Sequence, residues 1–226
     1  MKLSVVIPCY NEKDTIREIV KRVDALNINK EIIIVDNVST DGTREILKEL
    51  VSQYANLRVF FHKQHKGKGA ALRTGFKYVD GDIIVVQDAD LEYSPQEYCK
   101  LLKQINNGAV IVYGSRIKGR NKMMYFQYYL GNILVSLIAN ILYLPFVTDV
   151  LTCYKMFRKE VLNNINLRCF GFEFCTEFTA KVRKKGYKIC EVPIKYNPRT
   201  YEEGKKIKKK DGVIAIWSLL KYRFVD

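Results

Sequence analysis

The strongest constraint on the fold is an alternation of short apolar runs with helix-like stretches over the first 115 residues. The runs are rich in Val and Ile and do not alternate with polar residues, which is typical of parallel strands buried on both faces. The pattern predicts a doubly wound α/β sheet whose ligands lie beyond the carboxyl ends of its strands. The apolar runs are 3–7, 31–35, 57–61, 82–87 and 109–113, and the helix-like stretches are 13–26, 43–54, 69–79 and 95–106. A further strand is expected at 188–196.

Charge and cysteine usage narrow the classes of partner and compartment. The 226 residues carry a net charge of +14, and residues 151–226 hold 18 basic against 8 acidic residues. Such a surplus indicates an anionic partner: nucleic acid, a phosphorylated ligand or an acidic membrane surface. The six cysteines include no CxxC pair, which favours reduced thiols in an intracellular protein over a zinc site or a disulfide framework.

Residues 120–147 differ from the rest of the chain. Their apolar core, 133–147, is 15 residues long, whereas a membrane span needs about 20. Asn132, Ser136 and Asn140 recur every four residues and give a helix one polar stripe. Flanking aromatics and basic residues favour an amphipathic helix in a membrane interface. The alternative is a helical hairpin buried against the sheet.

The most specific chemical signal is a group of three acidic residues. Asp88 and Asp90 follow an apolar run, and Glu92 lies two residues further on. Three carboxylates at a strand end suit a hard cation, Mg²⁺ or Mn²⁺, which commonly binds substrate phosphates as well. The alternative is an acidic loop preceding the helix near Pro95, with Ser94 as its cap.

Two further strand ends carry candidate binding residues. The run Gly67-Lys68-Gly69 matches neither a Walker A loop nor a dinucleotide fingerprint, but it could present N–H groups and a lysine to an anion. Asp36, at the end of the second strand, could accept a hydrogen bond from a nucleobase, whereas Asp41 is better explained as a helix cap.

Five motifs in this order resemble the inverting family-2 glycosyltransferases, which have the Rossmann-like GT-A fold. They are VVIPCYNE at 5–12, VDNVSTDGT at 35–43, HKGKGAALRTGF at 65–76, QDADLEYSP at 87–95 and GSR at 114–116. Three later segments are similar to the dolichyl- and polyprenyl-phosphate sugar synthases: DVLTCYKMFRKEVL at 149–162, GFEFCTEF at 171–178 and EVPIKYNPRTYEEGKK at 191–206. Two departures are Asp36-Asn37-Val38 in place of Asp-Asp-Gly and residues 151–155 in place of Thr-Ser-Gly-Phe-Arg.

The resemblance implies a set of roles for residues of this chain. Asp88, Asp90 and Glu92 would bind Mg²⁺ or Mn²⁺, and Asp90, Arg116 and Asp149 would be catalytic. Arg116, Arg199, Lys205 and Lys206 would bind the acceptor phosphate. The nucleotide sugar would contact Pro8, Tyr10, Glu12, Asp36, Lys68, Gly69, Asp88, Ala89 and Asp90. One domain, 1–226, would divide into a nucleotide-sugar half at 1–118 and an acceptor half at 119–226, which has interface helices at 120–147 and a basic C-terminal segment.

The implied function is transfer of a sugar from a nucleotide diphosphate sugar to a polyprenyl or dolichyl phosphate, on the cytoplasmic face of an anionic membrane. GDP-mannose is favoured by resemblance alone, and UDP-glucose and UDP-N-acetylglucosamine remain open. A phosphate acceptor is already ionised and needs no strong base, whereas a hydroxyl acceptor would require one, for which Asp149 is the candidate. The alternatives are therefore a soluble family-2 enzyme acting on a hydroxyl, and a nucleic-acid-binding or non-catalytic nucleotide-binding protein. No nucleic-acid partner is expected, because the aromatics at 125–129 adjoin an apolar helix instead of a basic groove.

Overall fold

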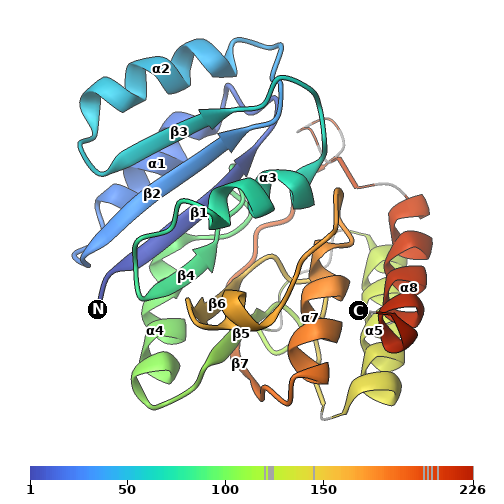
Figure 1. Cartoon of the computed structure of the whole chain (residues 1–226). Coiled ribbons are helices and arrows are strands. Elements are labelled where there is room, and N and C mark those ends of the chain that lie inside the picture. Colours follow the sequence, from blue (N-terminus) through green and yellow to red (C-terminus); the bar gives the residue numbers. More distant parts are fainter. Residues whose placement is uncertain are drawn as a thin grey trace.

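The fold is a mixed seven-stranded sheet covered by helices on both faces (Figure 1). The computed structural model describes residues 1–119, 121, 125–144, 146–200, 202, 204, 206–207 and 209–225. The strands are β1 (Leu3–Cys9), β2 (Lys30–Asp36), β3 (Leu57–Phe61), β4 (Ile83–Val86), β5 (Ile111–Ser115), β6 (Lys155–Arg158) and β7 (Ile189–Pro193). The helices are α1 (Ile16–Asp24), α2 (Thr43–Gln53), α3 (Lys68–Phe76), α4 (Tyr98–Asn106), α5 (Phe126–Tyr143), α6 (Val161–Asn164), α7 (Phe174–Lys184) and α8 (Lys209–Phe224), with a 3₁₀ turn η1 (Pro95–Glu97) before α4.

The strand order is β3-β2-β1-β4-β6-β5-β7, so the order reverses at β1 and β4. All five apolar runs of the first 115 residues form strands, which confirms the predicted mostly parallel sheet. β6 is the exception, because it runs antiparallel to both neighbours, β4 and β5. β6 and β7 come from the second half of the chain and complete the sheet that the first half begins.

Each face of the sheet has its own hydrophobic core. On one face α1, α2 and α4 contribute Ile19, Leu47 and Leu101, all of them fully buried. On the other face α3, α5, α7 and α8 pack around residues such as Leu72 and Phe178. This two-sided covering explains why the strands read as continuous apolar runs.

Helix α5 shows how the unusual segment 120–147 folds. Its described residues form one helix, not the hairpin of the alternative interpretation. The polar stripe of Asn132, Ser136 and Asn140 faces the protein, and the Asn140 side chain bonds both the N–H and the C=O of Val147, at 2.8 and 2.9 Å. By length and composition α5 could cross a membrane, although a third of it is buried inside the protein.

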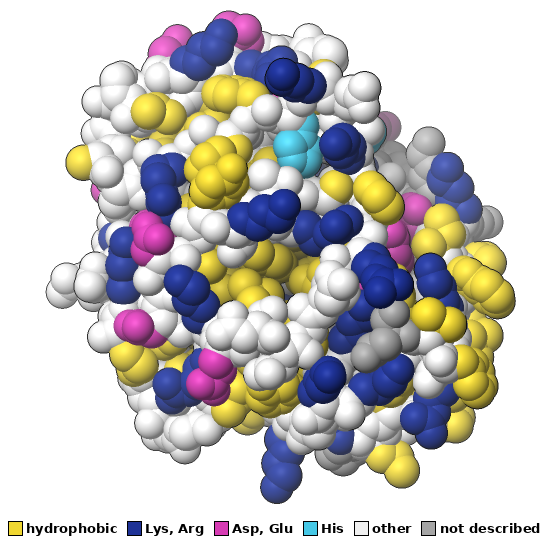
Figure 2. All heavy atoms as spheres, in the orientation of Figure 1, with side chains coloured by type: hydrophobic (Ala, Val, Ile, Leu, Met, Phe, Trp, Pro, Cys, Tyr) yellow, Lys and Arg dark blue, Asp and Glu magenta, His cyan; other side chains and the backbone are white. Residues whose placement is uncertain are grey.

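The outward face of α5 is apolar, which reverses the usual arrangement of an amphipathic helix. Its exposed side chains are Phe126, Leu130, Ile133, Leu134, Leu137 and Ile141, and the adjoining α8 adds Val213, Ile214, Trp217, Leu220 and Phe224. We call these eleven residues the α5/α8 face. Figure 2 shows hydrophobic side chains and Lys or Arg side chains together on the side of the molecule where α5 and α8 lie.

Candidate active site

A cavity of about 650 Å³ lies at the carboxyl ends of the central strands. Tyr10 reaches it from the end of β1, Asn37 from β2, Asp88 and Asp90 from β4, and Arg116 from β5. This is the position that the doubly wound topology predicts for a ligand, because the connections diverge where the strand order reverses. We call this space the polar cavity.

Most of the predicted site residues meet in the polar cavity. Those that line it are Pro8, Tyr10, Glu12, Lys68, Asp88, Ala89, Asp90, Glu92, Arg116, Arg199 and Lys206. Asp36, Gly69 and Asp149 do not line it: Asp36 and Gly69 are the chain neighbours of Asn37 and Lys68, which do, and Asp149 forms an ion pair with Arg116. Lys205 lies outside the described residues.

Each carboxylate of the acidic motif is paired with a basic or phenolic group. Lys68 forms an ion pair with Asp88, and the Arg199 guanidinium contacts Asp90 at 2.7 Å and Glu12 at 3.1 Å. Glu92 accepts hydrogen bonds from the Arg199 backbone N–H, at 2.7 Å, and from the Tyr196 hydroxyl. Within the described part of the chain, no three His, Cys, Asp or Glu side chains are arranged as a metal-ligand set. The metal role of Asp88, Asp90 and Glu92 therefore stays a prediction.

The donor set nevertheless fits a hard divalent cation. Burial, together with the nearby carboxylates of Asp88 and Glu92, raises the pKa of Asp90 to about 8, against the opposing effect of Arg199. A cation at close range stabilises the ionised form of such a carboxylate, and the Arg199 guanidinium occupies that position here. All the facing ligand atoms of the motif are oxygens, the type that Mg²⁺ and Mn²⁺ prefer.

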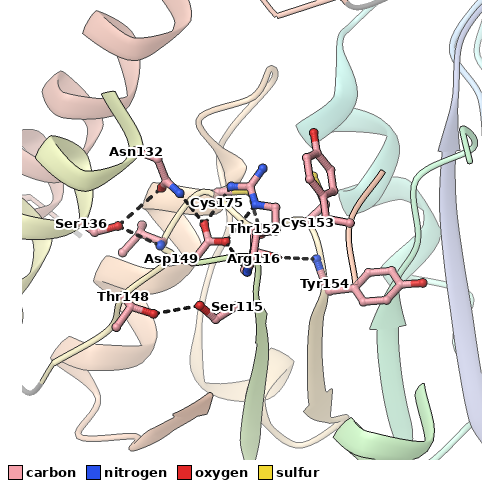
Figure 3. A network of polar contacts seen from close by, with 12 residues as sticks. Ser115, Arg116, Asn132, Ser136, Thr148, Asp149, Thr152, Cys153, Tyr154 and Cys175 are labelled. Atoms are coloured by element: carbon pink, nitrogen blue, oxygen red, sulfur yellow. Dashed lines mark hydrogen bonds and ion pairs between the residues drawn. The ribbon is translucent and has the colours of Figure 1, made fainter. Parts of the chain in front are cut away.

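Arg116 and Asp149 form a buried ion pair (Figure 3). Arg116 Nε and Nη2 each donate to Asp149 at 2.8 Å, and the Arg116 backbone N–H donates at 2.9 Å. Asn132 of α5 supplies a fourth hydrogen bond to the same carboxylate, at 2.8 Å. Burial alone would raise the pKa of Asp149, but these contacts with Arg116 lower it. Asp149 thus holds the guanidinium that faces the polar cavity.

Where the nucleobase is expected to bind, the residues that line the polar cavity differ from the predicted residue, Asp36. The Asp36 carboxylate is fully buried, forms an ion pair with Arg44 at 3.1 Å and accepts backbone N–H groups of the following turn. Asn37 and His65 line the cavity in its place, and the His65 ring lies 4.4 Å from that of Tyr10. Asn37 directly follows β2, and His65 lies in the loop after β3, so their positions could have indicated them, since strand ends supply ligand contacts in this topology.

The start of α3 packs against another loop. Gly69 N–H and Ala70 N–H donate to the carbonyls of Gly171 and Phe170, both at 3.1 Å. A Cβ on Gly69 would lie 2.8 Å from the Cys169 sulfur, so this close approach requires glycine. These two N–H groups are therefore engaged, and Gly67 and Lys68 are the residues of this motif that line the polar cavity.

A second cavity, of about 290 Å³, adjoins the first between α5, α7 and α8. We call it the apolar cavity, since Val135, Phe174 and Ala215 are typical of its lining. Both cavities share Lys68, Leu151, Cys153, Phe172, Ile207 and Asp211. A ligand with an anionic head and an apolar chain could therefore occupy both spaces at once.

Comparisons with known proteins assign the chain to an enzyme family. The model of the family "Glycosyl transferase family 2" matches residues 4–165, and the chain belongs to this family. Among solved structures, glucosyl-3-phosphoglycerate synthase from Mycobacterium tuberculosis superimposes with a TM-score of 0.74 at 20% identity, covering 100% of this chain and 79% of that one. This similarity confirms the predicted GT-A fold.

Two of three particular relatives are named for dolichol or dolichyl phosphate. A dolichol-phosphate mannosyltransferase of Pyrococcus furiosus is 36% identical over 91% of this chain and 59% of its own length. A UDP-N-acetylglucosamine–dolichyl-phosphate N-acetylglucosaminyltransferase of Methanococcus voltae is 34% identical over 84% of each chain. The low-salt glycan biosynthesis hexosyltransferase Agl6 of Haloferax volcanii is 32% identical, and this chain spans about half of its length. The chain thus covers only part of two of these relatives.

Proposed function

We propose that the protein transfers a sugar from a nucleoside diphosphate sugar to a polyprenyl or dolichyl phosphate at the cytoplasmic surface of a membrane. The observation that carries the proposal is the wall of six residues that the polar cavity and the apolar cavity share, beside the exposed α5/α8 face. A phosphate on a long hydrocarbon chain is an acceptor that matches both spaces.

The donor would bind along the carboxyl ends of β1, β2 and β4. The rings of Tyr10 and His65 and the amide of Asn37 suit a nucleobase. Asp88 and Asp90 would hold Mg²⁺ or Mn²⁺ with Glu92, and the ion would neutralise the charge of the leaving diphosphate. Arg199 would have to leave Asp90 as the ion binds, since both need the same carboxylate.

The acceptor phosphate would lie nearer to Arg116, Arg199 and Lys206. Arg116 is oriented by Asp149, and its guanidinium lies 5.3 Å from the ring centre of Tyr196. A planar guanidinium can bind a phosphate through two parallel hydrogen bonds. Attack by a phosphate oxygen on the anomeric carbon, opposite the leaving diphosphate, would invert that carbon and requires no proton acceptor.

The relatives support a lipid phosphate as acceptor but leave the sugar open. One is named for mannose and another for N-acetylglucosamine, and both are named for dolichol or dolichyl phosphate. Mannose remains the favoured sugar of the proposal. The +14 charge and the α5/α8 face together suit a surface of anionic lipids.

A transfer assay tests the proposal. The protein, Mn²⁺, a polyprenyl phosphate and radiolabelled GDP-mannose, UDP-glucose or UDP-N-acetylglucosamine are incubated, and the product is extracted into organic solvent. We expect label from one donor in the organic phase, released by mild acid, as the phosphodiester of a sugar requires. Label that stays in water, on a saccharide or protein hydroxyl, would contradict the lipid acceptor.

A further inference from the structure

A fully buried glutamine, Gln87, lies between the end of β4 and the acidic motif. Its backbone N–H donates to the Val6 carbonyl at 3.0 Å, which continues the pairing of β4 with β1. Its side-chain Nε2 donates to the carbonyl of Asp88 at 3.0 Å and to that of Tyr93 at 3.3 Å. These two carbonyls lie at the two ends of the segment 88–93, which we call the acidic loop. One amide group therefore holds both ends of the acidic loop from inside the protein.

Two tyrosines fix the orientation of this amide. The hydroxyls of Tyr98, at the start of α4, and Tyr154, directly before β6, donate to Gln87 Oε1 at 2.7 and 2.6 Å. Both tyrosines are fully buried, and burial raises the pKa of each well above its ordinary value, so both remain donors. Because Oε1 accepts from the two hydroxyls, Nε2 is directed to the two carbonyls. Both polar atoms of the Gln87 side chain thus have partners, as a buried amide requires.

The outer side of the acidic loop is held by the segment that carries Arg199. The Asn197 N–H donates to the Glu92 carbonyl at 2.9 Å, and the Arg199 N–H donates to the Glu92 carboxylate at 2.7 Å. In the proposed function the Arg199 side chain leaves Asp90 when the cation binds. The outer contacts therefore come from a segment that has to adjust, whereas those of Gln87 come from the sheet and its buried tyrosines.

We propose that Gln87 is a positioning residue for the acidic loop: its amide fixes the backbone of the loop and thereby the positions of its three carboxylates. This proposal deepens the proposed function, because it concerns the carboxylates assigned there to the metal ion. Gln87→Met keeps the length of the side chain and removes both of its polar groups. Since hydrogen-bond partners behind a metal site contribute about 10–100-fold to metal affinity, we expect this variant to bind Mn²⁺ with UDP or GDP about tenfold more weakly in isothermal titration.

A triple variant separates this role from a merely structural one. Gln87→Met alone should also lose stability, because two buried hydroxyls lose their acceptor. Gln87→Met/Tyr98→Phe/Tyr154→Phe removes those hydroxyls too, and replacing all the partners by apolar groups costs little stability. We expect the triple variant to recover stability in urea unfolding and to keep the weakened binding of Mn²⁺ with nucleotide.

Amide hydrogen exchange, measured by mass spectrometry without metal, reports on the acidic loop directly. We expect the amides of 88–93 to exchange faster in Gln87→Met and in the triple variant, because the loop opens without its inner contacts. Tyr143→Phe is the matched control, since it removes a buried hydroxyl that donates to the Leu219 carbonyl at 2.6 Å, where α5 meets α8. Its loop exchange and its Mn²⁺ binding should match those of the unchanged protein.

The proposal is overturned by unchanged exchange of the acidic loop in Gln87→Met, by recovery of Mn²⁺ affinity in the triple variant, or by an equal loss of affinity in Tyr143→Phe. If the unchanged protein binds Mn²⁺ with neither nucleotide, the proposed function fails. The exchange of residues 88–93 then decides alone whether Gln87 positions the loop.

Discussion

At the scale of single residues, the buried pair of Arg116 and Asp149 shows what the chain's motifs can and cannot predict. Both residues were expected in the site from the family resemblance. Their roles depend on Asn132, which lies on a different helix and completes the hydrogen bonding of the Asp149 carboxylate. The polar stripe of 120–147 contained this information, but only the fold reveals which carboxylate it meets. Asp149 therefore acts in our account by orienting Arg116, without accepting a proton from the acceptor.

The variant Asp149→Asn tests that role. The amide cannot accept both guanidinium hydrogen bonds, so the transfer rate should fall by about 10²-fold, and removing one partner of a buried pair should cost about 3–5 kcal/mol of stability. The pH–rate profile and the unfolding free energy are measured for both proteins. The acidic limb of the profile should keep its midpoint. Loss of that limb in the variant would identify Asp149 as a base and contradict the positioning role.

A second residue-scale prediction concerns Arg199, the cation that contacts Asp90. In Arg199→Gln the carboxylate loses this partner, so Mn²⁺ should bind about tenfold more tightly, while sugar transfer falls because the acceptor phosphate loses a guanidinium. Isothermal titration with Mn²⁺ measures the first effect. Arg44→Gln is the matched control, since Arg44 pairs with Asp36 outside the cavity. Weaker Mn²⁺ binding in Arg199→Gln would refute competition for Asp90.

At the scale of elements, the strands were more predictable than the helices of the second half. The apolar run at 31–35 is bounded by polar residues, and its type and place follow from burial on both faces. The run at 57–61 forms the edge strand β3, which is only partly buried, but polar residues bound it as well. β6 was not foreseen, because four residues carry too little periodicity to distinguish a strand, and its antiparallel direction depends on the path of the preceding loop. For α5 the stripe was predictable, but its inward direction was not.

The α5/α8 face gives an element-scale prediction. Leu137 and Ile141 are 50% and 69% exposed, and burying such a side chain in lipid contributes about 1.5–3 kcal/mol. Replacing both by Asp should reduce binding to anionic vesicles by more than tenfold in a co-sedimentation assay. Val51→Asp, on an exposed position of α2, is the control and should bind as the unchanged protein does. Equal binding by the α5 variant would show that this face does not contact lipid.

A stability prediction concerns Glu31 of β2, an interior strand of the sheet. Burial would raise the pKa of Glu31, but hydrogen bonds from Ser4 and from the backbone N–H groups of Asp80 and Gly81 lower it to about 2. A depressed pKa means that the ionised carboxylate stabilises the fold above about pH 4.5, and that this contribution is lost as the pH falls toward 2.

Glu31→Gln should therefore lower the unfolding free energy at pH 7 by about 1–2 kcal/mol, a value reduced to allow for solvent screening. The difference from the unchanged protein should shrink at pH 3, as measured by urea unfolding. Glu49→Gln, in an exposed ion pair with Arg17, should have almost no effect at either pH. An equal loss at both pH values would mean that Glu31 acts through packing and not through its charge.

At the scale of the whole molecule, the strand ends of one sheet and the helices of the second half enclose two adjoining cavities, and the charged side chains of the site line the larger one. The sequence allowed the position of the acidic motif to be predicted, because a parallel sheet places its strand ends at one edge. It could not reveal the shared wall at Lys68 and Cys153, since that contact joins residues 85 positions apart. A cavity between helices has no local signature in the chain.

The most direct test of the account compares Asp90→Asn with the unchanged protein in the lipid-phosphate transfer assay, with Mn²⁺ and with EDTA. Asp90 is buried in the loop after β4 and lines the polar cavity. Loss of one metal–phosphate interaction in the transition state should lower turnover by roughly 10²-fold or more. We predict that EDTA abolishes transfer by the unchanged protein, that Mn²⁺ restores it, and that the folded Asp90→Asn variant stays inactive under both conditions. Full transfer in EDTA, or by Asp90→Asn, would contradict the account.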